Sequence, residues 1–341
     1  MPNSLILTIA IPTRNRAAFL AQNLLQLKSE LQNIESDLVE IIVSDNYSSD
    51  ETEVVVNSII KTGLAVKYIK NPIDIGWGKN FLQCFNISSG KYVLILGDDD
   101  FFVDGALSKL INHLKYDEYG IICVKTFGFD YCFKNENPGG SATSQLYDDP
   151  GEFINDAGAL LSLISACVIN KNLASSASLE LDQSPNLPVL HLVLRAAIAA
   201  KKNLFLKEYM IGCKRNNSSN YNFSEIFVGE MWNIIRKECS DLVSNTWIER
   251  LEKKLLVEYY PIYLLQIRIS DDGATSSNHQ IFESGFGSNI RYKYWIKPIF
   301  ILPRFLAIPY GFMLTFIGRV LGGDFRRGFH FVKYRLYRLI K

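Results

Sequence analysis

Short apolar segments alternate with amphipathic segments through the first third of the chain, and this alternation constrains the fold more than any other feature. The apolar segments predict strands at 5–12, 39–46, 65–71 and 91–100. The amphipathic segments have helical spacing and predict helices at 16–31, 50–62 and 76–90. Strands and helices in this order form βαβ units, in which right-handed crossovers place helices on both faces of a parallel sheet. The sequence therefore predicts an α/β, Rossmann-like fold with a mostly parallel sheet.

The pattern becomes mixed after residue 105. The further expected strands are 120–133, 164–172 and 203–215, and the further expected helices are 151–163 and 187–202. The polar segment 216–222 is the best candidate for a domain boundary, because a helical period begins directly after it. We therefore predict an α/β domain over 1–223 and a helical region over 224–341.

Polar residues follow each of the four N-terminal strands at the point where the strand ends. These residues are Thr13–Arg16, Ser44–Asn46, Asn71 and Asp98–Asp100. Ligands of open α/β sheets bind in the crevice beyond the carboxyl ends of the strands. The four strand ends therefore predict a single ligand-binding site.

Three consecutive aspartates, Asp98 to Asp100, directly follow an apolar strand. Carboxylates about 4 Å apart repel by roughly 4 kcal/mol per pair at an effective dielectric constant near 20, so this crowding requires a counter-cation. The alternative is a turn with a capping aspartate before the next helix, since Asp is favoured in both places. Asp104 is expected to cap that helix already, which leaves the three acids unexplained and favours a metal site.

The familiar phosphate-binding loops are missing from the sequence. There is no GxxxxGK[ST] segment and no GxGxxG after the first strand, which argues against a P-loop NTPase and a dinucleotide dehydrogenase. A divalent cation is the simplest other means of binding phosphate, because Mg²⁺ usually sits on one or two carboxylates together with substrate phosphates. We therefore expect Mg²⁺ or Mn²⁺ to bridge a carboxylate of Asp98–Asp100 and a diphosphate.

Composition narrows the partners and the compartment. A net charge of +1 gives no support for nucleic-acid binding. The six cysteines form no CxxC pair, so we expect reduced thiols in a cytoplasmic protein. The N-terminal apolar run lacks a basic segment before it and a cleavage site after it, which predicts a first strand and not a signal peptide.

Four segments carry a resemblance to a known family: "IAIPTRNRAAFL", "EIIVSDNYSSDET", "NPIDIGWGKNF" and "KYVLILGDDDFF". In order and spacing they resemble the N-terminal motifs of family 2 glycosyltransferases with the GT-A fold, and most of all the O-antigen branch that contains abequosyltransferases. The likeness is strong over 5–110 and weaker to about 223. It implies a nucleotide-sugar half over about 1–110 and an acceptor half over about 111–223.

The resemblance also implies an activity. The chain would be a metal-dependent, inverting hexosyltransferase or deoxyhexosyltransferase. Its donor would be a nucleotide sugar, and its acceptor would be a glycan, either lipid-linked O-antigen or another surface polysaccharide.

The resemblance assigns the first two strand ends to the nucleotide. Pro12, Thr13 and Asn15 match the loop that touches the base, and Asp45 matches the acid that hydrogen-bonds the base. Arg14 stands where the family usually has an aromatic ring, and its guanidinium would stack on the base instead.

The third and fourth strand ends match in part. Lys79 and Asn80 match a basic–Asn pair beside the nucleotide, although Lys79 is equally consistent with a solvated helix charge. Within the acidic triple, the match places Asp98 towards the ribose and Asp99 on the metal, and Asp100 would support the loop or the sugar. The family's usual first metal-binding acid is replaced by a glycine here, so affinity for free metal should be low. Asp50 is interpreted as a helix N-cap.

The catalytic base is not evident. Inverting transfer needs a group that takes the proton of the acceptor hydroxyl. The family's Glu-Asp pair would fall on Pro188 and Val189, so it is missing. His191 and Asp182 are the candidates, although a lone histidine on an apolar helix also fits a packed residue. Arg215 lies where family members often have a basic residue near the diphosphate.

The C-terminal segment 291–341 is basic and aromatic, with eleven Lys and Arg against one acid, Asp324. It fits an interfacial anchor on an anionic membrane leaflet, and the alternative is an ordinary helical packing domain. The uncharged stretch Phe305–Gly318 is expected to be too short to span a membrane and to be interrupted by Pro309. We therefore expect a peripheral protein on the inner face of the bacterial cell membrane, where a polyprenyl-linked acceptor would lie.

Two other functions remain open on the sequence alone. The missing Glu-Asp pair fits a nucleotide-sugar-binding protein without catalysis, which would release no nucleoside diphosphate. A metal-dependent nucleotidyltransferase or phosphatase on a similar sheet would release pyrophosphate or free phosphate instead.

Overall fold

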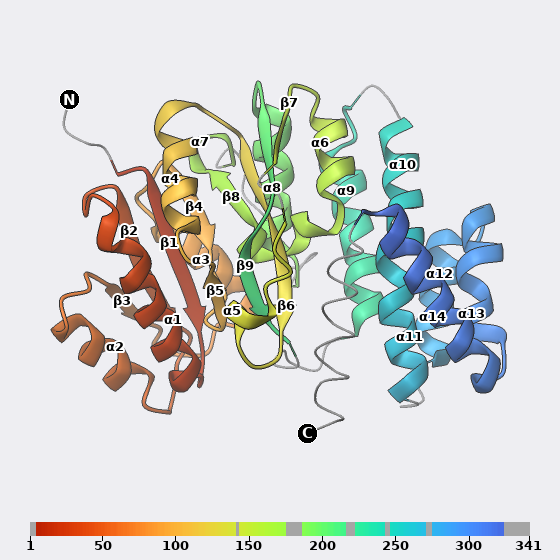
Figure 1. Cartoon of the computed structure of the whole chain (residues 1–341), viewed down its shortest axis with the longest axis horizontal. Coiled ribbons are helices and arrows are strands. Elements are labelled where there is room, and N and C mark those ends of the chain that lie inside the picture. The colour runs from red at the N-terminus through yellow and green to blue at the C-terminus, as the bar shows by residue number, and fades with distance from the viewer. Residues whose placement is uncertain are drawn as a thin grey trace. The chain divides into compact units, whose positions relative to one another are not determined.

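The computed structural model describes residues 5–140, 143–174, 186–215, 222–242, 246–270 and 275–323. The chain divides into two compact units. The first comprises Met1–Phe153 and Leu160–Ser218, and the second comprises Ile154–Ala159 and Ser219–Lys341. The first unit contains the sheet, and the described part of the second is helical (Figure 1).

The described strands of the first unit form one sheet in the order β3-β2-β1-β4-β8-β6-β9-β5, with β7 paired to β9. They are β1 (Leu7–Thr13), β2 (Val39–Asp45), β3 (Lys67–Lys70), β4 (Tyr92–Ile95), β5 (Asp100–Phe102), β6 (Ile121–Phe129), β7 (Ser144–Tyr147), β8 (Cys167–Asn170) and β9 (Asn203–Lys214). Strands β3, β2, β1 and β4 are parallel, as the sequence predicts. Beyond β4 the sheet is mixed, because β8 enters antiparallel between β4 and β6 whereas β6 and β9 are parallel. The predicted α/β class is confirmed.

Helices cover both faces of this sheet (Figure 1). The helices up to residue 199 are α1 (Ala17–Glu30), η1 (Leu31–Asn33), α2 (Thr52–Lys61), α3 (Trp77–Ile87), α4 (Ala106–Tyr116), α5 (Phe133–Glu136), α6 (Pro150–Ala157), η2 (Gly158–Ser162), η3 (Ile164–Ala166), α7 (Lys171–Ala174) and α8 (Pro188–Ala199). Helices α1, α2 and α4 share one hydrophobic core with the strands, while α3 packs against β1, β2 and α8. The crossovers thus leave the carboxyl ends of β1, β2 and β4 at one edge of the sheet.

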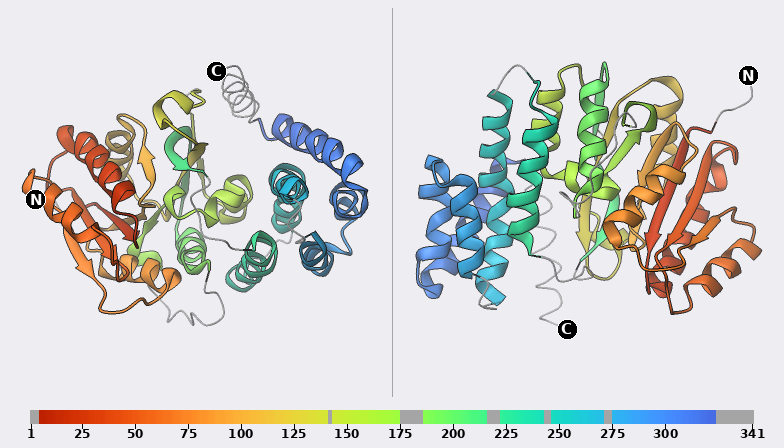
Figure 2. Two further views of the ribbon diagram at one scale, coloured as in Figure 1. Left: turned by 90° about the horizontal axis from the view of Figure 1, so that it is seen from below. Right: turned by 180° about the vertical axis from the view of Figure 1, so that it is seen from behind.

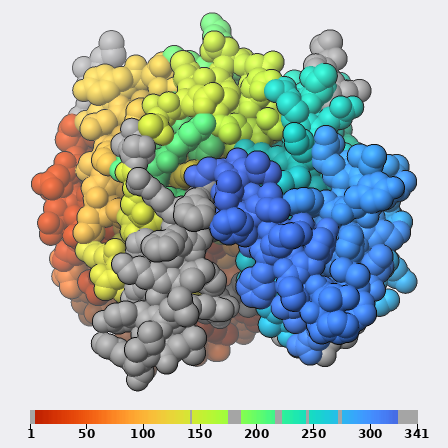
Figure 3. Space-filling view, turned by 45° about the vertical axis from the view of Figure 1, so that its right-hand side comes forward, coloured from red at the N-terminus to blue at the C-terminus, as the bar shows by residue number. Residues whose placement is uncertain are grey.

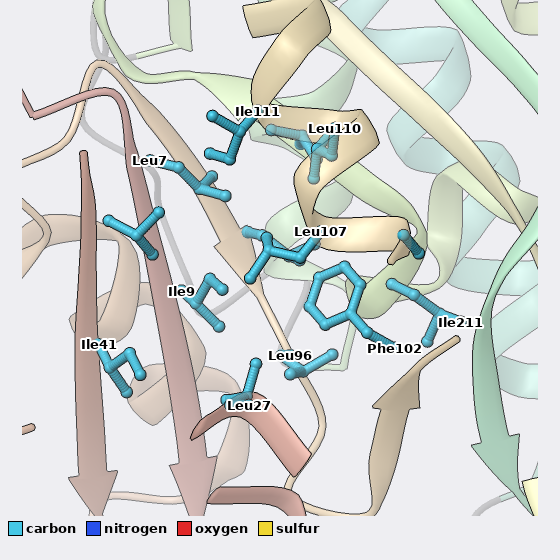
Figure 4. Packing of buried hydrophobic residues seen from close by; sticks show 14 of the residues in the cluster. Leu7, Ile9, Leu27, Ile41, Leu96, Phe102, Leu107, Leu110, Ile111 and Ile211 are labelled. Atoms are coloured by element: carbon cyan, nitrogen blue, oxygen red, sulfur yellow. The ribbon is translucent and has the colours of Figure 1, made fainter. Parts of the chain in front are cut away.

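The core fixes the segment that carries the three aspartates. Leu96 and Phe102 flank this segment on either side, and both are buried among Ile9 of β1, Leu27 of α1 and Leu107 of α4 (Figure 4). Each such side chain stabilises the fold by about 1.5–3 kcal/mol when fully buried. The acidic turn is therefore anchored at both ends by the core.

Two local predictions need correction here. Asp100 was expected in a strand over 91–100, but it begins the separate short strand β5. Asp104 does not cap α4; instead the carboxylate of Glu30 accepts the N–H groups of Gly105 (2.9 Å) and Leu107 (3.2 Å). A buried carboxylate at the end of α1 is well placed for this role, because the helix N-terminus favours negative charge.

The second unit is helical, as predicted for residues after 223. Its described helices are η5 (Glu225–Glu230), α9 (Met231–Glu238), α10 (Thr246–Lys254), η6 (Leu255–Tyr259), α11 (Tyr260–Ser270), α12 (Thr275–Phe286), η7 (Tyr292–Ile296), α13 (Lys297–Ile301) and α14 (Arg304–Leu321). They run side by side (Figure 2) around buried aromatic side chains. The Tyr260 hydroxyl accepts the Trp232 indole N–H at 2.9 Å and donates to the Phe227 carbonyl at 2.8 Å. This segment therefore has a packed core of its own.

Helix α14 runs through Pro309, so the expected interruption was wrong. The face of α14 that packs against the other helices carries glycines. A Cβ on Gly311 would lie 3.0 Å from Leu265, and one on Gly318 would lie 2.4 Å from the Val257 carbonyl oxygen, so the helices approach closely here. This close packing outweighs the one backbone hydrogen bond that the proline removes.

Helix α14 is also long and apolar enough to cross a membrane, judged by length and composition, with a mean hydropathy of 1.3 and only 22% of it buried. Its large exposed side chains are Phe305, Leu306, Phe312, Met313, Phe316, Val320 and Leu321. Figure 3 shows α14, in dark blue, at the surface of the second unit.

Candidate active site

The loops after β1 and β2 are joined by hydrogen bonds. Asn15 adopts a left-handed conformation with φ of 53°, which Asn tolerates better than most residues. Its backbone N–H donates to the Ser48 hydroxyl at 2.8 Å, and its side-chain oxygen accepts the Ser49 N–H at 2.8 Å. The predicted base-contacting residue thus holds the two loops at a fixed distance.

Asp50 connects the two helices that follow these loops. One carboxylate oxygen accepts the Ala17 N–H at the start of α1 (3.0 Å), and the other accepts the Thr52 N–H at the start of α2 (3.1 Å). These hydrogen bonds hold the pKa of Asp50 below its ordinary value, although burial opposes them. The N-cap of α2 is Glu51, so the prediction that Asp50 caps this helix was wrong by one residue. Asp50 instead joins the first N–H groups of two helices.

Asp45 ends β2 and is completely buried. Its carboxylate accepts the Ser48 N–H at 2.8 Å and the Tyr68 hydroxyl at 2.6 Å. Burial and the neighbouring Asp45 carboxylate together raise the pKa of Tyr68, so the phenol stays protonated and keeps donating. The carboxylate is thereby fixed at the strand end; its contact with a nucleotide base stays a prediction.

The two members of the predicted basic–Asn pair, Lys79 and Asn80, lie in different environments. Asn80 is buried, accepts the Ser44 hydroxyl at 2.7 Å and donates to the Ser44 carbonyl at 3.0 Å. It therefore supports the end of β2 from beneath. Lys79, in contrast, is exposed on α3. Arg14 pairs with Asp74, a half-exposed acid that also accepts the Asn46 amide and the Gly76 N–H.

Asp98 is buried beneath the first strand end. Its carboxylate accepts the Thr13 hydroxyl at 2.7 Å, and its other oxygen lies 3.2 Å from the Arg16 Nε. Burial raises the pKa of Asp98 to about 7, even though Arg16 and Thr13 favour the ionised form. Thr13 and Asp98, both predicted for the nucleotide, are thus brought together from separate strands.

Asp99 also contacts Arg16, through the terminal guanidinium nitrogen. Arg16 therefore bridges Asp98 and Asp99, and its guanidinium lies 5.2 Å from the Phe19 ring. The Asp99 side chain is 14% exposed and that of Arg16 is 29% exposed. The sequence analysis assigned no individual role to Arg16. The signal for its ion pairs was available, because a basic residue follows β1 and acidic residues follow the adjacent parallel strand β4.

Asp100 points away from this pair. Its carboxylate accepts the hydroxyl of Ser165, in η3, and Ser165 also accepts the Gly97 N–H at 3.0 Å. Burial, followed by the nearby Asp99 charge, raises the pKa of Asp100 to about 7. A Cβ at Gly97 would lie 2.8 Å from the Asp100 carboxylate, so a larger residue there would displace this side chain. Asn23 of α1 completes the turn by donating to the Asp100 carbonyl at 2.6 Å.

The donor set fits a metal shared with a substrate better than a metal held by protein alone. Among the residues that the structure describes, no group of three or more His, Cys, Asp or Glu converges on a metal position. Asp98 is committed to Thr13, and Asp100 to Ser165. Asp99 is the partly exposed member of the triple, and one carboxylate with substrate phosphates suffices for Mg²⁺.

The acceptor-side candidates are less defined. His191 is buried within α8, which begins with the apolar Pro188 and Val189, and Asp182 lies outside the described residues. Arg215, at the end of β9, pairs with Asp130 at 3.0 Å and lies 3.7 Å from the Glu136 carboxylate. The structure thus brings Arg215 to an acidic pair, and its place near the diphosphate stays a prediction.

A parallel half-sheet with nucleotide-type polar residues at the ends of β1, β2 and β4, continued by a mixed half, is the GT-A architecture of glycosyltransferases. Residues 8–169 match the model of the family "Glycosyl transferase family 2". Residues 8–169 therefore form a domain of glycosyltransferase family 2, as the motifs indicate.

Two curated relatives and one solved structure are informative. The chain is 38% identical over 106 residues to a Campylobacter jejuni protein named GalNAc(5)-diNAcBac-PP-undecaprenol beta-1,3-glucosyltransferase. It is 29% identical over 111 residues to abequosyltransferase RfbV of Salmonella typhimurium. These matches cover 31% and 32% of this chain, and each covers 33% of the relative.

The structural comparison extends further along the chain. S. aureus TarS 1-349, solved in complex with UDP-GlcNAc, superposes with a TM-score of 0.57 and 14% identity. The match covers 91% of this chain and 90% of that one. At 14% identity this likeness establishes the fold alone, which is a GT-A domain followed by helices.

Proposed function

We propose that this protein is an inverting glycosyltransferase that moves a hexose or deoxyhexose from a nucleotide-sugar donor to a lipid-linked glycan, either O-antigen or another surface polysaccharide. The observation that carries the proposal is the meeting of Thr13, Asp45, Asp98 and Asp99 at the ends of three parallel strands in a family 2 domain. Both curated relatives are named as sugar transferases, and one is named for an undecaprenol-linked substrate.

Each strand end has a separate task in this proposal. The base lies against the loop 12–15 and Asp45, and the ribose lies at Asp98. The diphosphate lies beside Asp99 and Arg16. A divalent cation on Asp99, Mg²⁺ or Mn²⁺, would supply positive charge to the leaving diphosphate.

The chemistry is a single displacement. A general base, His191 or Asp182, takes the proton of an acceptor hydroxyl while the hydroxyl oxygen bonds to the anomeric carbon. The bond from that carbon to the diphosphate oxygen breaks, and the nucleoside diphosphate leaves with the electron pair. Positive groups held where this charge develops stabilise the transition state more than the ground state.

Turnover tests the proposal directly. We expect nucleoside diphosphate to be released from one of UDP-, GDP-, CDP- or dTDP-sugars when bacterial membranes supply the polyprenyl-linked acceptor. Release of pyrophosphate or free phosphate would indicate a nucleotidyltransferase or phosphatase instead. Saturable donor binding without release would favour the second candidate, a nucleotide-sugar-binding protein, for which the apolar Pro188 and Val189 at the expected Glu-Asp position are the supporting observation.

We further propose that the protein acts from the inner face of the cell membrane, with α14 in the interface. The exposed row on α14, from Phe305 to Leu321, is apolar and aromatic, and the segment 291–341 that contains it is strongly basic. Apolar side chains that enter the acyl boundary beside basic residues on anionic headgroups are typical of interfacial helices.

Vesicle flotation tests this placement. The double variant Phe312→Ser/Phe316→Ser should lose binding to phosphatidylglycerol vesicles. Tyr116→Ser, which removes an even more exposed aromatic from α4, should retain it. Equal binding by both variants would contradict the placement. Point variants are preferable to deletion of 291–341, because that deletion would also remove Tyr292 and Ile296, which are buried in the second unit.

A further inference from the structure

Arg16 is the cation that the structure places on the acidic turn. Its Nε lies 3.2 Å from one Asp98 oxygen, and its terminal nitrogen contacts an Asp99 oxygen. One guanidinium thus serves two carboxylates that come from consecutive positions. The repulsion among the three adjacent acids is therefore reduced in part by a basic residue of the same chain.

The backbone of Arg16 is fixed by the start of α1, while its side chain is partly exposed. The Arg16 carbonyl accepts the Phe19 N–H at 3.0 Å and the Leu20 N–H at 3.1 Å, so the residue forms the start of α1. Asp50 holds the next residue through the Ala17 N–H. The Arg16 side chain is 29% exposed, and its guanidinium lies 5.2 Å from the centre of the Phe19 ring. Solvent therefore reaches this side chain.

A divalent cation and this guanidinium compete for the same carboxylate. If a metal bound Asp99, the metal and the Arg16 guanidinium would both lie against one carboxyl group. Two positive charges that close together repel strongly in a partly buried site. A diphosphate removes the conflict, because it offers oxygens both to the metal and to a guanidinium. The planar fork of arginine matches phosphate oxygens as well as it matches a carboxylate.

We propose that Arg16 closes the Asp98–Asp99 pair to free metal, and that a divalent cation binds Asp99 only together with a nucleoside diphosphate group, which takes over the displaced guanidinium. This inference rests on the proposed function for the identity of the diphosphate. Arg16 is then a residue that couples metal binding to donor binding. By thermodynamic linkage the coupling is reciprocal: the diphosphate tightens metal binding by the same factor by which the metal tightens diphosphate binding.

The test measures Mn²⁺ binding by electron paramagnetic resonance in the full chain without nucleotide. Arg16→Gln should bind Mn²⁺ at least about tenfold more tightly than wild type, which corresponds to about 1.4 kcal/mol. Arg14→Gln is the matched control, since it removes the same charge from the same loop but from a residue paired with Asp74. Equal Mn²⁺ affinity in Arg16→Gln and Arg14→Gln would overturn the proposal.

A second arm needs no variant and so does not depend on folding of a mutant. Wild-type protein should bind Mn²⁺ at least about tenfold more tightly with UDP, GDP, CDP or dTDP present than with metal alone, after correction for the nucleotide's own metal binding. Tight wild-type binding of Mn²⁺ alone would overturn the proposal. If none of the four nucleotides binds, the proposed function fails, whereas the comparison of Arg16→Gln with Arg14→Gln still decides the role of Arg16.

Discussion

The donor-side strand ends and the start of α8 differ in how far the chain itself prepares them for chemistry. At the strand ends, Asp45 and Asp98 already receive hydrogen bonds from side chains of neighbouring segments, and Asp98 and Asp99 share a guanidinium. At the start of α8, apolar Pro188 and Val189 occupy the positions where the family resemblance leads one to expect two acids.

The difference separates binding from catalysis. A nucleotide sugar can be recognised by groups whose positions are fixed before it arrives, which reduces the entropy lost on binding. A general base instead needs access to the acceptor and a suitable pKa, and neither property follows from a buried helix position. The geometry therefore supports the proposed donor site, while the proposed base has to be identified by kinetics.

The largest change in kcat is expected from substitution of the candidate base on the acceptor side. If His191 is the base, His191→Ala should lower kcat by roughly a hundredfold to ten-thousandfold and leave donor binding nearly unchanged. Activity should also fall as pH drops through the histidine pKa, because only neutral imidazole accepts a proton. His113→Ala, on α4, is the control and should leave kcat near wild type. A destabilised His191→Ala protein with normal kcat would move the assignment to Asp182.

The next effect concerns the donor side. Asp99→Asn should keep the fold and lower kcat by roughly a hundredfold to a thousandfold, because charge at the leaving diphosphate is stabilised in the transition state. Asp104→Asn removes an exposed acid that pairs with Lys134 and should have little effect. Wild-type turnover in Asp99→Asn at saturating Mn²⁺ would contradict the role of Asp99.

A smaller effect sharpens the distinction between recognition and chemistry. Asp45→Ala should raise the KM for the nucleotide sugar by roughly tenfold to a hundredfold, since hydrogen bonds to charged groups contribute about 1.5–3 kcal/mol. The kcat at saturation should change little, because base contacts are equal in ground and transition states. Tyr68→Phe removes only one donor to Asp45 and should change KM less. An unchanged KM in Asp45→Ala would remove Asp45 from the donor site.

The smallest expected effect is on stability without ligand. The pKa of Asp100 is about 7 in the folded protein and near 4 when unfolded, so between these values the folded state binds more protons. For this group, stability should therefore be greatest below about pH 4 and should fall as pH rises from about 4 to about 7, by up to about 1.4 kcal/mol per unit. Asp100→Asn should flatten the decline of melting temperature between about pH 4 and about 7. The same slope in the variant would show that another group causes it.

The hydrophobic periodicity of the sequence predicted the N-terminal half of the sheet, and the polar residues at the strand ends predicted the candidate site. The alternation of segments over 5–100 predicted β1 to β4 and their helices, and the polar strand ends predicted which residues would meet. Asp45, Thr13 and Asp98 were assigned through their place in the motifs, and the structure puts them at one edge of the sheet.

The contacts that hold the site could not be predicted in the same way. The hydrogen bonds that Asn23, Ser165 and Arg16 make to the acidic turn span 65 to 83 positions of the sequence, and only the sheet topology brings these residues together. Strand β5 has three residues, too few to show a period. The cap of α4 comes from Glu30 rather than Asp104 for the same reason: a distant side chain replaced the local one.

We propose that the ends of β1, β2 and β4 bind a nucleotide sugar together with a divalent cation. A thermal-shift panel of UDP-, GDP-, CDP- and dTDP-sugars, each with and without Mn²⁺, tests this claim. Donor at a hundred times its dissociation constant stabilises by about 2.7 kcal/mol, which raises the melting temperature by several degrees. We predict such a rise for sugars of one base, larger with Mn²⁺ than without. A melting temperature that none of the four donors raises, with or without metal, would contradict the claim.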